Sequence, residues 1–550
     1  MGNSLPQISL MKSFLSTRKD AVFALLLGLL TVTGTWLLHS STPTGLGLTD
    51  DAISYISAAD ALLRGQGFTR IWLATGLEPV THWPPLFSAL MAATSSILEI
   101  SPYRSARLIN ILVFGVNVGI IGFLGWKMTH SRLAGIFLSL LFFSNSTLFR
   151  LHAQALSEPH YLLISLLAFL TFYRAVEFRP RMGVNAHAKF IKPAKADSPK
   201  QPTLAWGLIP MRGKWLILAG ILTGLSYLTR YAALSLLATF IVAIFILRPS
   251  WKKRFSSLAY FLAGALPVML AWMLRNKLVG GSATNRAFEW HPVTVDNAQR
   301  GLKSFLRFSV PMPEIYSAFL ESSFLLLIIP SLITFVLFLW LIPRGLKYFL
   351  KPKENTRPET LSFITTLYIF TYMGSLLISL NIFDAATPLN DRILSPVYLA
   401  CLIILVYFIH WVAQQGKIPA RIIAFGIATF FLGIAIVAQI RTVEDLQESA
   451  HGFASWRWRE SVVLEAIREL PADISIYTNQ PPAVYFWTDR PVYRLWDEQP
   501  KALRSGDAVL AIFWPVDDES PEFQAWLDEM TDGLVTIEKS GLGYLYQAQP

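Results

Sequence analysis

Long apolar runs alternate with short polar connections along most of the chain, up to about residue 440. A helix of roughly 20 predominantly apolar residues crosses a bilayer core, so each run of about this length predicts one membrane span. We predict about eleven spans on this basis, at residues 21–39, 105–126, 133–149, 156–173, 215–229, 232–247, 256–274, 322–341, 361–380, 393–412 and 422–439. The pattern therefore predicts an α-helical polytopic membrane protein.

Basic residues are concentrated in alternate connections between these runs, namely before the first run and after those ending near residues 126, 173, 247, 341 and 412. Cytoplasmic connections collect Lys and Arg, so these connections and the N-terminus are predicted to be cytoplasmic. An odd number of spans then places the C-terminus on the opposite side. The first run is too long for a signal-peptide core and is predicted to be an uncleaved span. Residues 179–212 are predicted to be a flexible cytoplasmic linker.

The pattern changes after residue 440, where apolar positions follow alternating helix and strand periods. Helices are predicted at 458–470 and 522–530, strands at 474–478, 508–513, 534–538 and 543–548, and a short element at 483–486. This alternation predicts a small α/β domain. The predicted domains are a cytoplasmic N-terminus at 1–20, a transmembrane domain at 21–440 with its first outer loop at 40–104, and an extracytoplasmic α/β domain at 441–550.

The composition supports a membrane location. Charged residues make up 15% and hydrophobic residues 53% of the 550 residues, whereas soluble domains carry about 25% charged residues. The net charge of +11 does not indicate nucleic-acid binding, because the basic residues follow the topology and form no patch interleaved with aromatic residues. The single cysteine, Cys401, lies in an apolar run, which excludes a disulfide framework and a thiolate metal site.

The first outer loop opens with two adjacent carboxylates, Asp50 and Asp51, directly after the first span. Apolar residues then recur at helical spacing, Thr49 can cap this helix, and the Gly-x-Gly at 65–67 can end it. Acidic residues at the membrane boundary are costly unless they are used. Residues 86–98 are apolar but short, and they are predicted to form a helix at the membrane interface.

A third acid, Glu158, lies at the start of a predicted span on the same predicted face of the membrane. Carboxylates at one face can converge on a cavity, where one takes a proton from a hydroxyl and another orients it or holds a cation. The alternative is that Asp50 only caps its helix and Glu158 only occupies a helix N-terminus beside Pro159. Both interpretations stay open at this point.

The acid pair, Tyr55 four residues after Asp51, the helix ending in Gly-x-Gly and the later Pro84-Pro85-Leu86 resemble the first extracytoplasmic loop of the GT-C glycosyltransferases. The similarity is strongest to the bacterial branch with protein O-mannosyltransferases and lipid A aminoarabinose transferases. Ser157-Glu158-Pro159 resembles the second acidic position of this family. The resemblance implies an enzyme of the inner (plasma) membrane, with Asp51 as catalytic base, Asp50 as the alternative base and Glu158 assisting.

The resemblance also implies a sugar donor carried on a polyprenyl phosphate and an acceptor that is a lipid, a glycan or a protein. A departing phosphate needs fixed positive charge, and the arginine fork matches phosphate oxygens best. Arg230 in Leu-Thr-Arg-Tyr and Arg392 in Asp-Arg-Ile-Leu-Ser-Pro resemble recurrent family features and are predicted to bind the phosphate. A role as interfacial anchor is the alternative for each. Other basic candidates on this face are Arg150, His152, Arg275 and Arg286.

Tyr55 and His82 are predicted to contact substrate, with lining of the loop as the alternative for His82. Some relatives hold a divalent cation with acids of these loops, so Asp50, Asp51 and Glu158 are candidate oxygen ligands for Mg or Mn. No histidine-rich ligand set supports zinc. Metal dependence stays open.

The predicted function is an inverting glycosyltransferase that moves a sugar from a polyprenyl-phosphate donor to an acceptor hydroxyl at the outer face. A membrane transporter or lipid flippase is the alternative, because intramembrane charge also marks substrate pathways. That alternative predicts acids near the bilayer midplane and an internal repeat, whereas these acids cluster at one predicted face. A scaffold whose C-terminal domain binds a partner is a third interpretation. The sequence identifies neither the sugar nor the acceptor.

Overall fold

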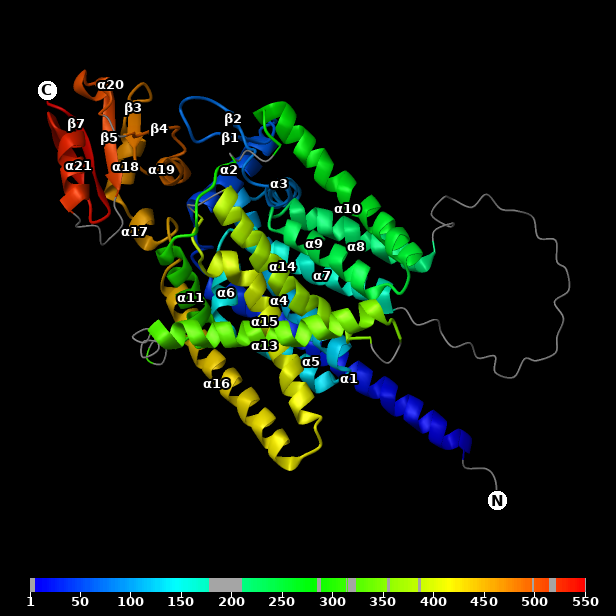
Figure 1. Ribbon diagram of the computed structural model, residues 1–550. Helices are drawn as coiled ribbons and strands as arrows, with labels where there is room; N and C mark the ends of the chain where they lie inside the picture. The colour runs from blue at the N-terminus through cyan, green and yellow to red at the C-terminus, as the bar shows by residue number, and fades with distance from the viewer. Residues whose placement is uncertain are drawn as a thin grey trace. The chain divides into compact units, whose positions relative to one another are not determined.

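The computed structural model describes residues 5–177, 210–283, 288–312, 314, 323–353, 357–383, 387–496, 499–513 and 521–549. Most of the predicted linker at 179–212 and the basic candidate Arg286 lie outside these residues. The described part is mainly helical, with one five-stranded sheet and one two-stranded sheet (Figure 1).

Eight helices among the described residues are long and apolar enough to cross a membrane. They are α1 (Leu5–Ser41), α4 (Pro102–Thr129), α7 (Glu158–Glu177), α10 (Trp251–Gly280), α13 (Ser323–Leu350), α14 (Thr360–Ile382), α15 (Asp391–Ala413) and α16 (Ile418–Glu448). The bent pair α5 (Arg132–Phe143) and α6 (Ser146–His152) makes a ninth if it counts as one span. The prediction of an α-helical polytopic membrane protein is confirmed.

Three of the predicted spans differ from the regular pattern. α8 (Met211–Tyr227) and α9 (Ala233–Leu247) have 17 and 15 residues, fewer than the roughly 20 that cross a bilayer core. The predicted span at 133–149 is bent by 63° between α5 and α6. Asn145 explains this break, because its side-chain oxygen accepts the backbone N–H of Leu148 at 2.9 Å and caps a new helix. The count of about eleven spans stays a prediction.

The chain forms two compact units. Unit 1 comprises residues 1–34, 115–148 and 160–439, and unit 2 comprises residues 35–114, 149–159 and 440–550. Helices α1, α4, α6, α7 and α16 contribute residues to both units. Each unit is therefore assembled from three separate segments of the sequence.

In unit 1, α8 packs closely against α10 because glycines lie at the contact. A side-chain carbon on Gly220 would lie 2.1 Å from the carbonyl oxygen of Phe261, and one on Gly264 would lie 2.1 Å from that of Ile217. Small residues permit such close approach of helices within a membrane. The remainder of unit 1 includes the shorter helix α11 (Val295–Ser309) between α10 and α13 in the chain.

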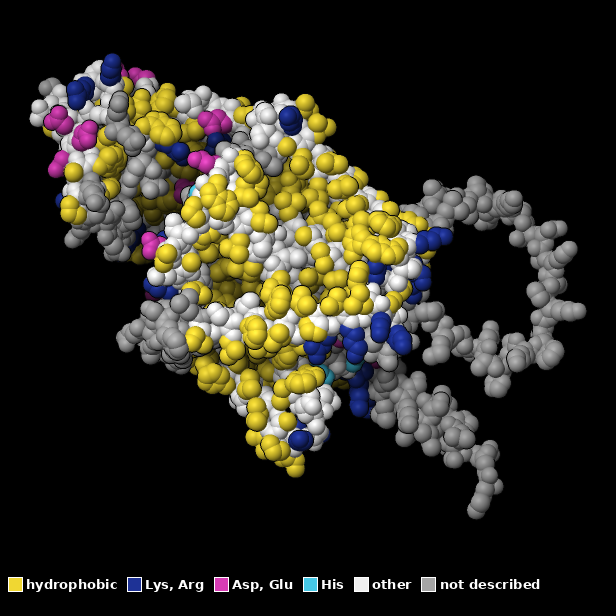
Figure 2. Space-filling model, viewed as in Figure 1, with side chains coloured by type: hydrophobic (Ala, Val, Ile, Leu, Met, Phe, Trp, Pro, Cys, Tyr) yellow, Lys and Arg dark blue, Asp and Glu magenta, His cyan; other side chains and the backbone are white. Residues whose placement is uncertain are grey.

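The outer surface of unit 1 is strongly apolar. Figure 2 shows hydrophobic side chains spread over its helices, with Lys and Arg gathered at one margin. On α13 and α16, the side chains of Phe335, Leu339, Phe425 and Phe430 are each more than half exposed. Contiguous apolar surface around long helices is typical of a lipid-facing protein.

Unit 2 contains the predicted elements of the C-terminal region. Its sheet has the order β4 (Tyr493–Arg494), β3 (Ser475–Thr478), β5 (Ala508–Phe513), β7 (Gly543–Ala548) and β6 (Leu534–Lys539). β3 runs parallel to β4 and β5, whereas β7 runs antiparallel to β5 and β6. The helices of this region are α17 (Trp456–Arg459), α18 (Val462–Glu469), α19 (Pro481–Thr488), α20 (Lys501–Arg504) and α21 (Pro521–Thr531).

These bounds confirm the predicted strands and the predicted helix at 522–530. The helix predicted at 458–470 is instead divided into α17 and α18, because Ser461 caps the second helix through the backbone N–H of Leu464. β4 is absent from the prediction, since a strand of two residues carries no periodic signal.

The predicted first outer loop also belongs to unit 2. α2 (Asp50–Leu63) begins at the predicted cap and is followed by Gly65 and Gly67 in left-handed conformations. The paired strands β1 (Thr69–Arg70) and β2 (Glu78–Pro79) and the predicted helix α3 (Leu86–Leu98) follow. One hydrophobic cluster joins this loop to the C-terminal region, and it includes Ile53, Ile56, Phe87, Ile467, Ile476 and Phe513. The two regions therefore share a core.

Candidate active site

The acid pair lies in the first turn of α2, where the helix dipole favours negative charge. The hydroxyl oxygen of Thr49 accepts the backbone N–H of Ala52 at 3.3 Å and caps the helix as predicted. Asp51 Oδ1 accepts the indole N–H of Trp83 at 2.9 Å. This hydrogen bond orients the half-buried Asp51 carboxylate.

Asp50 has different surroundings from its neighbour. Its side chain lies at the exposed start of α2. Partial desolvation and the like charge of Asp51 raise the pKa of Asp50, and Arg494 opposes this shift. Arg494 belongs to β4, so the C-terminal region contributes a positive charge beside the acid pair. Neighbouring carboxylates with different surroundings can divide the roles of proton acceptor and electrostatic partner.

Tyr55 connects the acid-bearing helix to the segment before Glu158. It follows Asp51 by one helical turn and therefore lies on the same face of α2. Its side chain is 3% exposed, and its hydroxyl lies 3.0 Å from the hydroxyl of Ser157. Phe87 packs edge-on against its ring with the centroids 5.5 Å apart. These contacts make Tyr55 a fixed link between two segments that are 102 residues apart.

Glu158 is buried, with 1% of its surface exposed, at the start of α7. The backbone upstream of it pairs with the backbone upstream of the acid pair, since Gly47 donates to Ala153 at 2.8 Å and accepts from Ala155 at 3.0 Å. Asn110 holds the same segment by donating to the carbonyl of Gln154 at 2.6 Å. Backbone pairing thus joins the segment that precedes Asp50 and Asp51 to the segment that precedes Glu158.

A third segment pairs with the same stretch of backbone. Leu48 donates to the carbonyl of His451 at 3.0 Å, and its own carbonyl accepts from Phe453 at 3.0 Å. Residues 46–48, 153–155 and 451–453 together form what we name the backbone junction. It lies at the beginning of the first loop, of the Glu158 segment and of the C-terminal region.

His82 is exposed, and its ring packs edge-on against Trp83 with centroids 5.1 Å apart. Arg70 lies over the same Trp83 at 5.8 Å and over Trp72 at 5.2 Å, and it forms an ion pair with Glu78. The loop after α2 therefore surrounds the tryptophan that holds Asp51. His82 is exposed at this site, in accord with either of its predicted roles.

Two basic candidates in unit 2 have structural partners. Arg150 donates to Asp445 at 2.6 Å and lies 3.1 Å from Nε2 of His451. His152 is fully buried, and its ring packs edge-on against Phe114 with centroids 5.0 Å apart. These contacts favour a structural role for both residues.

Arg230 lies in the turn between α8 and α9 in unit 1. The hydroxyl of the adjacent Tyr231 accepts N–H groups from Trp272 at 3.0 Å and from Asn276 at 3.3 Å, which fixes this turn on α10. Arg275 donates to the side-chain oxygen of Asn276 at 3.0 Å. The predicted phosphate ligand is therefore held on a turn that polar side chains support.

Arg392 lies in the first turn of α15, also in unit 1. Tyr372 donates to the backbone carbonyl of the residue that follows Arg392 at 2.6 Å. Tyr372 packs edge-on against Tyr368, whose hydroxyl lies 2.7 Å from that of Tyr161. Tyr161 is close enough to interact electrostatically with Arg230. Three tyrosines thus connect the two predicted phosphate ligands, while the carboxylates belong to unit 2.

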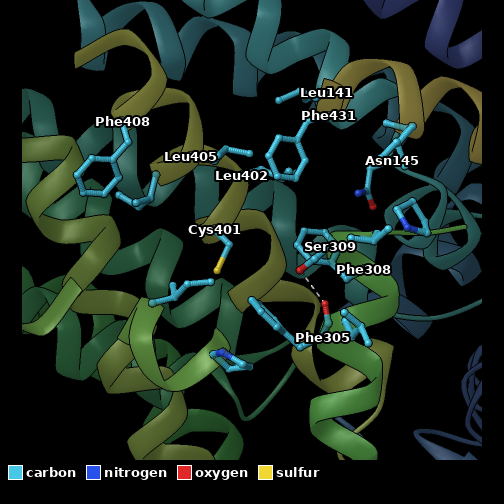
Figure 3. Close-up of a pocket in the computed structure, with 18 of the residues that line it drawn as sticks. Leu141, Asn145, Phe305, Phe308, Ser309, Cys401, Leu402, Leu405, Phe408 and Phe431 are labelled. Atoms are coloured by element: carbon cyan, nitrogen blue, oxygen red, sulfur yellow. Dashed lines mark hydrogen bonds between the residues drawn. The ribbon is translucent and has the colours of Figure 1, made fainter. Parts of the chain in front are cut away.

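A cavity of about 570 Å³ lies in unit 1, among α5, α11, α13, α14, α15 and α16. Figure 3 shows its lining, with Leu402, Leu405, Phe431 and Phe308 around the space and Cys401 in its wall. Its few polar groups include the hydroxyl of Ser309, which donates to a backbone carbonyl within α11 at 2.8 Å. The cavity suits an apolar ligand.

No group of three or more His, Cys, Asp or Glu side chains that could hold a metal is found in the part of the chain that the structure describes. Asp50, Asp51 and Glu158 therefore do not belong to such a group within the described residues.

Trp83 and Arg494 belong to the candidate site but are not predicted from the sequence. His82-Trp83-Pro84-Pro85 is visible as a cluster, but nothing in it identifies the indole as the partner of Asp51. Arg494 carries no sequence signal, because its proximity to Asp50 depends on packing of the C-terminal region against the first loop.

No family model and no curated protein matches the sequence. Among solved structures, the oligosaccharyltransferase of Archaeoglobus fulgidus in the apo form matches at 12% identity and a TM-score of 0.52, over 96% of this chain and 74% of that one. The same protein tethered with an acceptor peptide containing the NVT sequon matches at 11% identity and a TM-score of 0.51, over 94% and 74%.

A further match is ArnT from Cupriavidus metallidurans bound to undecaprenyl phosphate, at 12% identity and a TM-score of 0.48, over 95% of this chain and 98% of that one. Identities this low relate folds and not individual sites. The likeness to the archaeal enzyme extends over nearly the whole of this chain. The chain therefore shares the fold of this archaeal oligosaccharyltransferase.

Proposed function

We propose that this protein is an inverting glycosyltransferase, which moves a sugar from a polyprenyl-phosphate donor to an acceptor hydroxyl at the outer face of the membrane. One observation carries the proposal, namely the link through Tyr55 between the acid-bearing face of α2 and the Ser157–Glu158 segment. Polar side chains and backbone pairing hold both acidic segments in one compact unit. This is the support that a proton-accepting carboxylate needs.

In the proposed reaction Asp51 accepts the proton of the acceptor hydroxyl. The hydroxyl oxygen bonds to the anomeric carbon while the bond from that carbon to the phosphate oxygen breaks, which inverts the configuration. The electron pair leaves with the polyprenyl phosphate, whose charge Arg230 and Arg392 stabilise. No glycosyl-enzyme forms, so one base is sufficient, in contrast to a retaining mechanism.

The apolar cavity of unit 1 supports a lipid-linked donor. Its volume of about 570 Å³ falls within the roughly 300–1,000 Å³ typical of ligand pockets. An isoprenoid chain would be covered by its Leu, Ile and Phe side chains, whereas a water-soluble sugar nucleotide would find few polar partners there. We assign the lipid portion of the donor to this cavity.

We further propose a multi-pass protein of the inner membrane, with a cytoplasmic N-terminus and an extracytoplasmic C-terminal domain. The alternate placement of basic connections supports this orientation. Alkaline phosphatase fused after residue 550 should be active, and the same reporter inserted within 179–212 should be inactive. The reverse pattern would contradict the orientation.

Gene deletion followed by complementation tests the proposed function. Mass spectrometry would identify which envelope glycolipid, glycan or glycoprotein loses a sugar in the deletion strain. Wild type should restore that product, Asp51→Asn should not, and Asp60→Asn should, because Asp60 lies at the far end of the same helix. All three proteins must be compared at equal membrane abundance.

Full restoration by Asp51→Asn would contradict the base assignment. An assay with detergent-solubilised protein, the lost product's lipid-linked sugar and its acceptor then separates an enzyme from a transporter. A transferase forms the glycosidic bond without a membrane barrier, whereas a transporter or flippase does not.

A further inference from the structure

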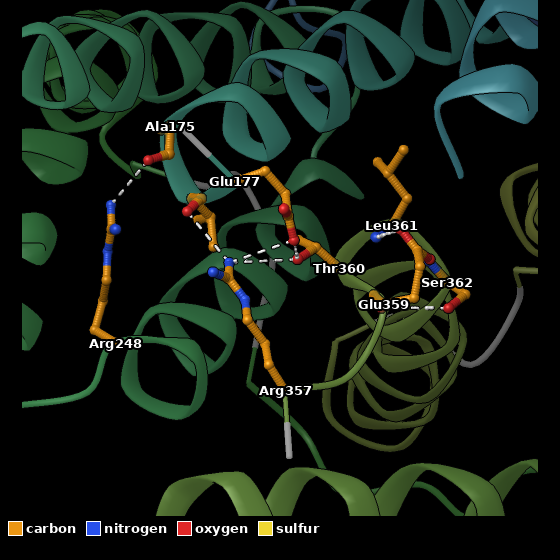
Figure 4. Close-up of polar contacts among 9 residues, drawn as sticks. Ala175, Glu177, Arg248, Arg357, Glu359, Thr360, Leu361 and Ser362 are labelled. Atoms are coloured by element: carbon orange, nitrogen blue, oxygen red, sulfur yellow. Dashed lines mark hydrogen bonds and ion pairs between the residues drawn. The ribbon is translucent and has the colours of Figure 1, made fainter. Parts of the chain in front are cut away.

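Arginines from three elements of unit 1 gather at the C-terminal end of α7. Arg212 lies in the first turn of α8, Arg248 follows the last residue of α9, and Arg357 precedes α14. Figure 4 shows the side chains of Arg248 and Arg357 extending toward the end of α7, to Ala175 and Glu177. Arg230 precedes α9 and Arg248 follows it, so this cluster lies at the other end of that helix from the predicted donor-phosphate ligand.

Arg248 is the most deeply buried member, with 6% of its surface exposed. One terminal nitrogen donates to the carbonyl of Ala175 at 3.4 Å, and its Nε has no hydrogen-bond partner within the residues that the structure describes. Burial and the neighbouring Arg212 and Arg357 lower the pKa of Arg248 to about 10. The side chain therefore keeps its charge at neutral pH although its surroundings disfavour that charge.

Arg357 has one acidic partner. It lies 3.5 Å from the Glu177 carboxylate and donates to the carbonyl of Val176 at 3.2 Å. Its Nε is buried and, again among the described residues, makes no hydrogen bond. A guanidinium has five N–H donors, so the two arginines have donors beyond those used by these partners.

The second nearby acid, Glu359, does not neutralise the cluster. Its carboxylate accepts the backbone N–H groups of Leu361 at 2.9 Å and Ser362 at 2.6 Å and thereby caps α14. Burial raises its pKa to about 7, so at neutral pH a substantial fraction carries no charge. Among the described residues, the guanidinium groups of Arg248 and Arg357 thus have one ionised acidic neighbour, Glu177, which is already paired with Arg357.

We propose that Arg248 and Arg357, with Arg212 as a third cation, form a binding site for a phosphate group. Buried positive charge that lacks a counter-ion is costly, and an anion that enters such a cluster is stabilised by the same charge. Phosphate oxygens match the guanidinium fork, and Arg254 supports the arrangement by donating to the backbone carbonyl of Arg248 at 3.0 Å. The phosphate group is either the headgroup of a membrane phospholipid or a free phosphate ion.

The test uses full-length protein in a phosphate-free maltoside detergent, with the thermal unfolding midpoint as readout. Inorganic phosphate is titrated against sodium chloride at equal ionic strength, and phosphatidylglycerol is titrated against diacylglycerol. We expect a saturable rise of the midpoint with at least one phosphate-bearing ligand in wild type. Arg248→Gln and Arg357→Gln should each need at least tenfold more ligand, whereas the exposed Lys253→Gln should match wild type.

Saturation by inorganic phosphate identifies a free-phosphate site, and saturation by phosphatidylglycerol alone identifies a lipid headgroup site. Arg248→Lys keeps the charge without the fork and should bind with intermediate affinity, which covers the case that Arg248→Gln does not fold. The proposal is overturned if neither ligand gives a saturable rise in wild type. It is equally overturned if the arginine variants respond like Lys253→Gln.

Discussion

At the scale of single residues, the candidate base depends on Trp83. The indole N–H is a neutral donor that reaches Asp51 from 32 positions away in the sequence. A hydrogen bond to an ionised group is worth about 1.5–3 kcal/mol. Trp83 itself is held by contacts with His82 and Arg70, so its position is part of the folded loop and not a free rotamer.

We expect Trp83→Phe to lower kcat by about tenfold or more, because the ring is kept while the donor to Asp51 is lost. Trp36→Phe is the matched control, since Trp36 is 63% exposed at the end of α1. Steady-state kinetics in detergent would measure both variants. Equal kcat values for Trp83→Phe and wild type would show that the indole does not orient the base.

The acid pair also predicts a change in the pH profile. Burial and repulsion from the Asp51 carboxylate raise the pKa of Asp50, and the repulsion between the two charges is mutual. Removing the charge in Asp50→Asn should therefore shift the acid-side fall of kcat/KM to lower pH. A profile measured on both proteins would contradict the coupling if this limb stayed in place or moved to higher pH.

The sequence predicts much of this site at residue level, because helical spacing alone places Asp51 and Tyr55 on one face and Thr49 at the cap. It could not predict the hydroxyl contact between Tyr55 and Ser157 or the charge of Arg494 beside Asp50. Both depend on which distant segments pack against the loop. Local propensity contains no information about such partners.

At the scale of elements, the backbone junction requires a glycine at position 452. Gly452 has φ +64°, and a side-chain carbon there would lie 2.1 Å from the carbonyl oxygen of Leu48. A left-handed conformation costs an L-residue roughly 1–2 kcal/mol, and here the contact with Leu48 adds to that cost. The junction is therefore specified by a residue whose only role is to have no side chain.

We expect Gly452→Ala to lower the free energy of unfolding by about 2 kcal/mol or more. Gly506→Ala separates the two causes, because Gly506 has φ +82° but nothing within 4 Å of an added carbon. Chemical unfolding in detergent would measure both variants. Equal losses for the two would show that only backbone strain, and not the approach of Leu48, matters at the junction.

The bounds of some helices and strands can be predicted from the sequence pattern alone. Apolar periodicity predicts β5 and α3 at their observed bounds, and α2 nearly so, because each has a continuous apolar signal with a clear start and end. Breaks within a helical pattern are harder to predict. Asn145 and Ser461 each start a new helix through one side-chain cap, and the apolar periodicity continues across both positions.

At the scale of the whole molecule, neither compact unit corresponds to one continuous stretch of sequence. The C-terminal region and the first loop are separated by most of the membrane helices, yet they share one hydrophobic cluster. Tyr103 packs edge-on against Phe486 with centroids 5.4 Å apart, and Trp487 donates to the carbonyl of Phe453 at 2.8 Å. Such long-range assembly cannot be derived from local patterns.

This shared core predicts that residues 441–550 do not fold independently. Removing the first loop exposes the faces of Ile467, Ile476 and Val484 that belong to the common cluster, and each buried aliphatic side chain contributes about 1.5–3 kcal/mol. The sum for several such residues is comparable to the 5–15 kcal/mol stability of a whole domain. We therefore expect the isolated region to show no cooperative thermal transition by circular dichroism, whereas a fusion of 40–104 to 441–550 through a flexible linker should regain one. A sharp transition for the isolated region, at the same midpoint as the fusion, would mean that the loop packs on a preformed domain and adds nothing to its stability.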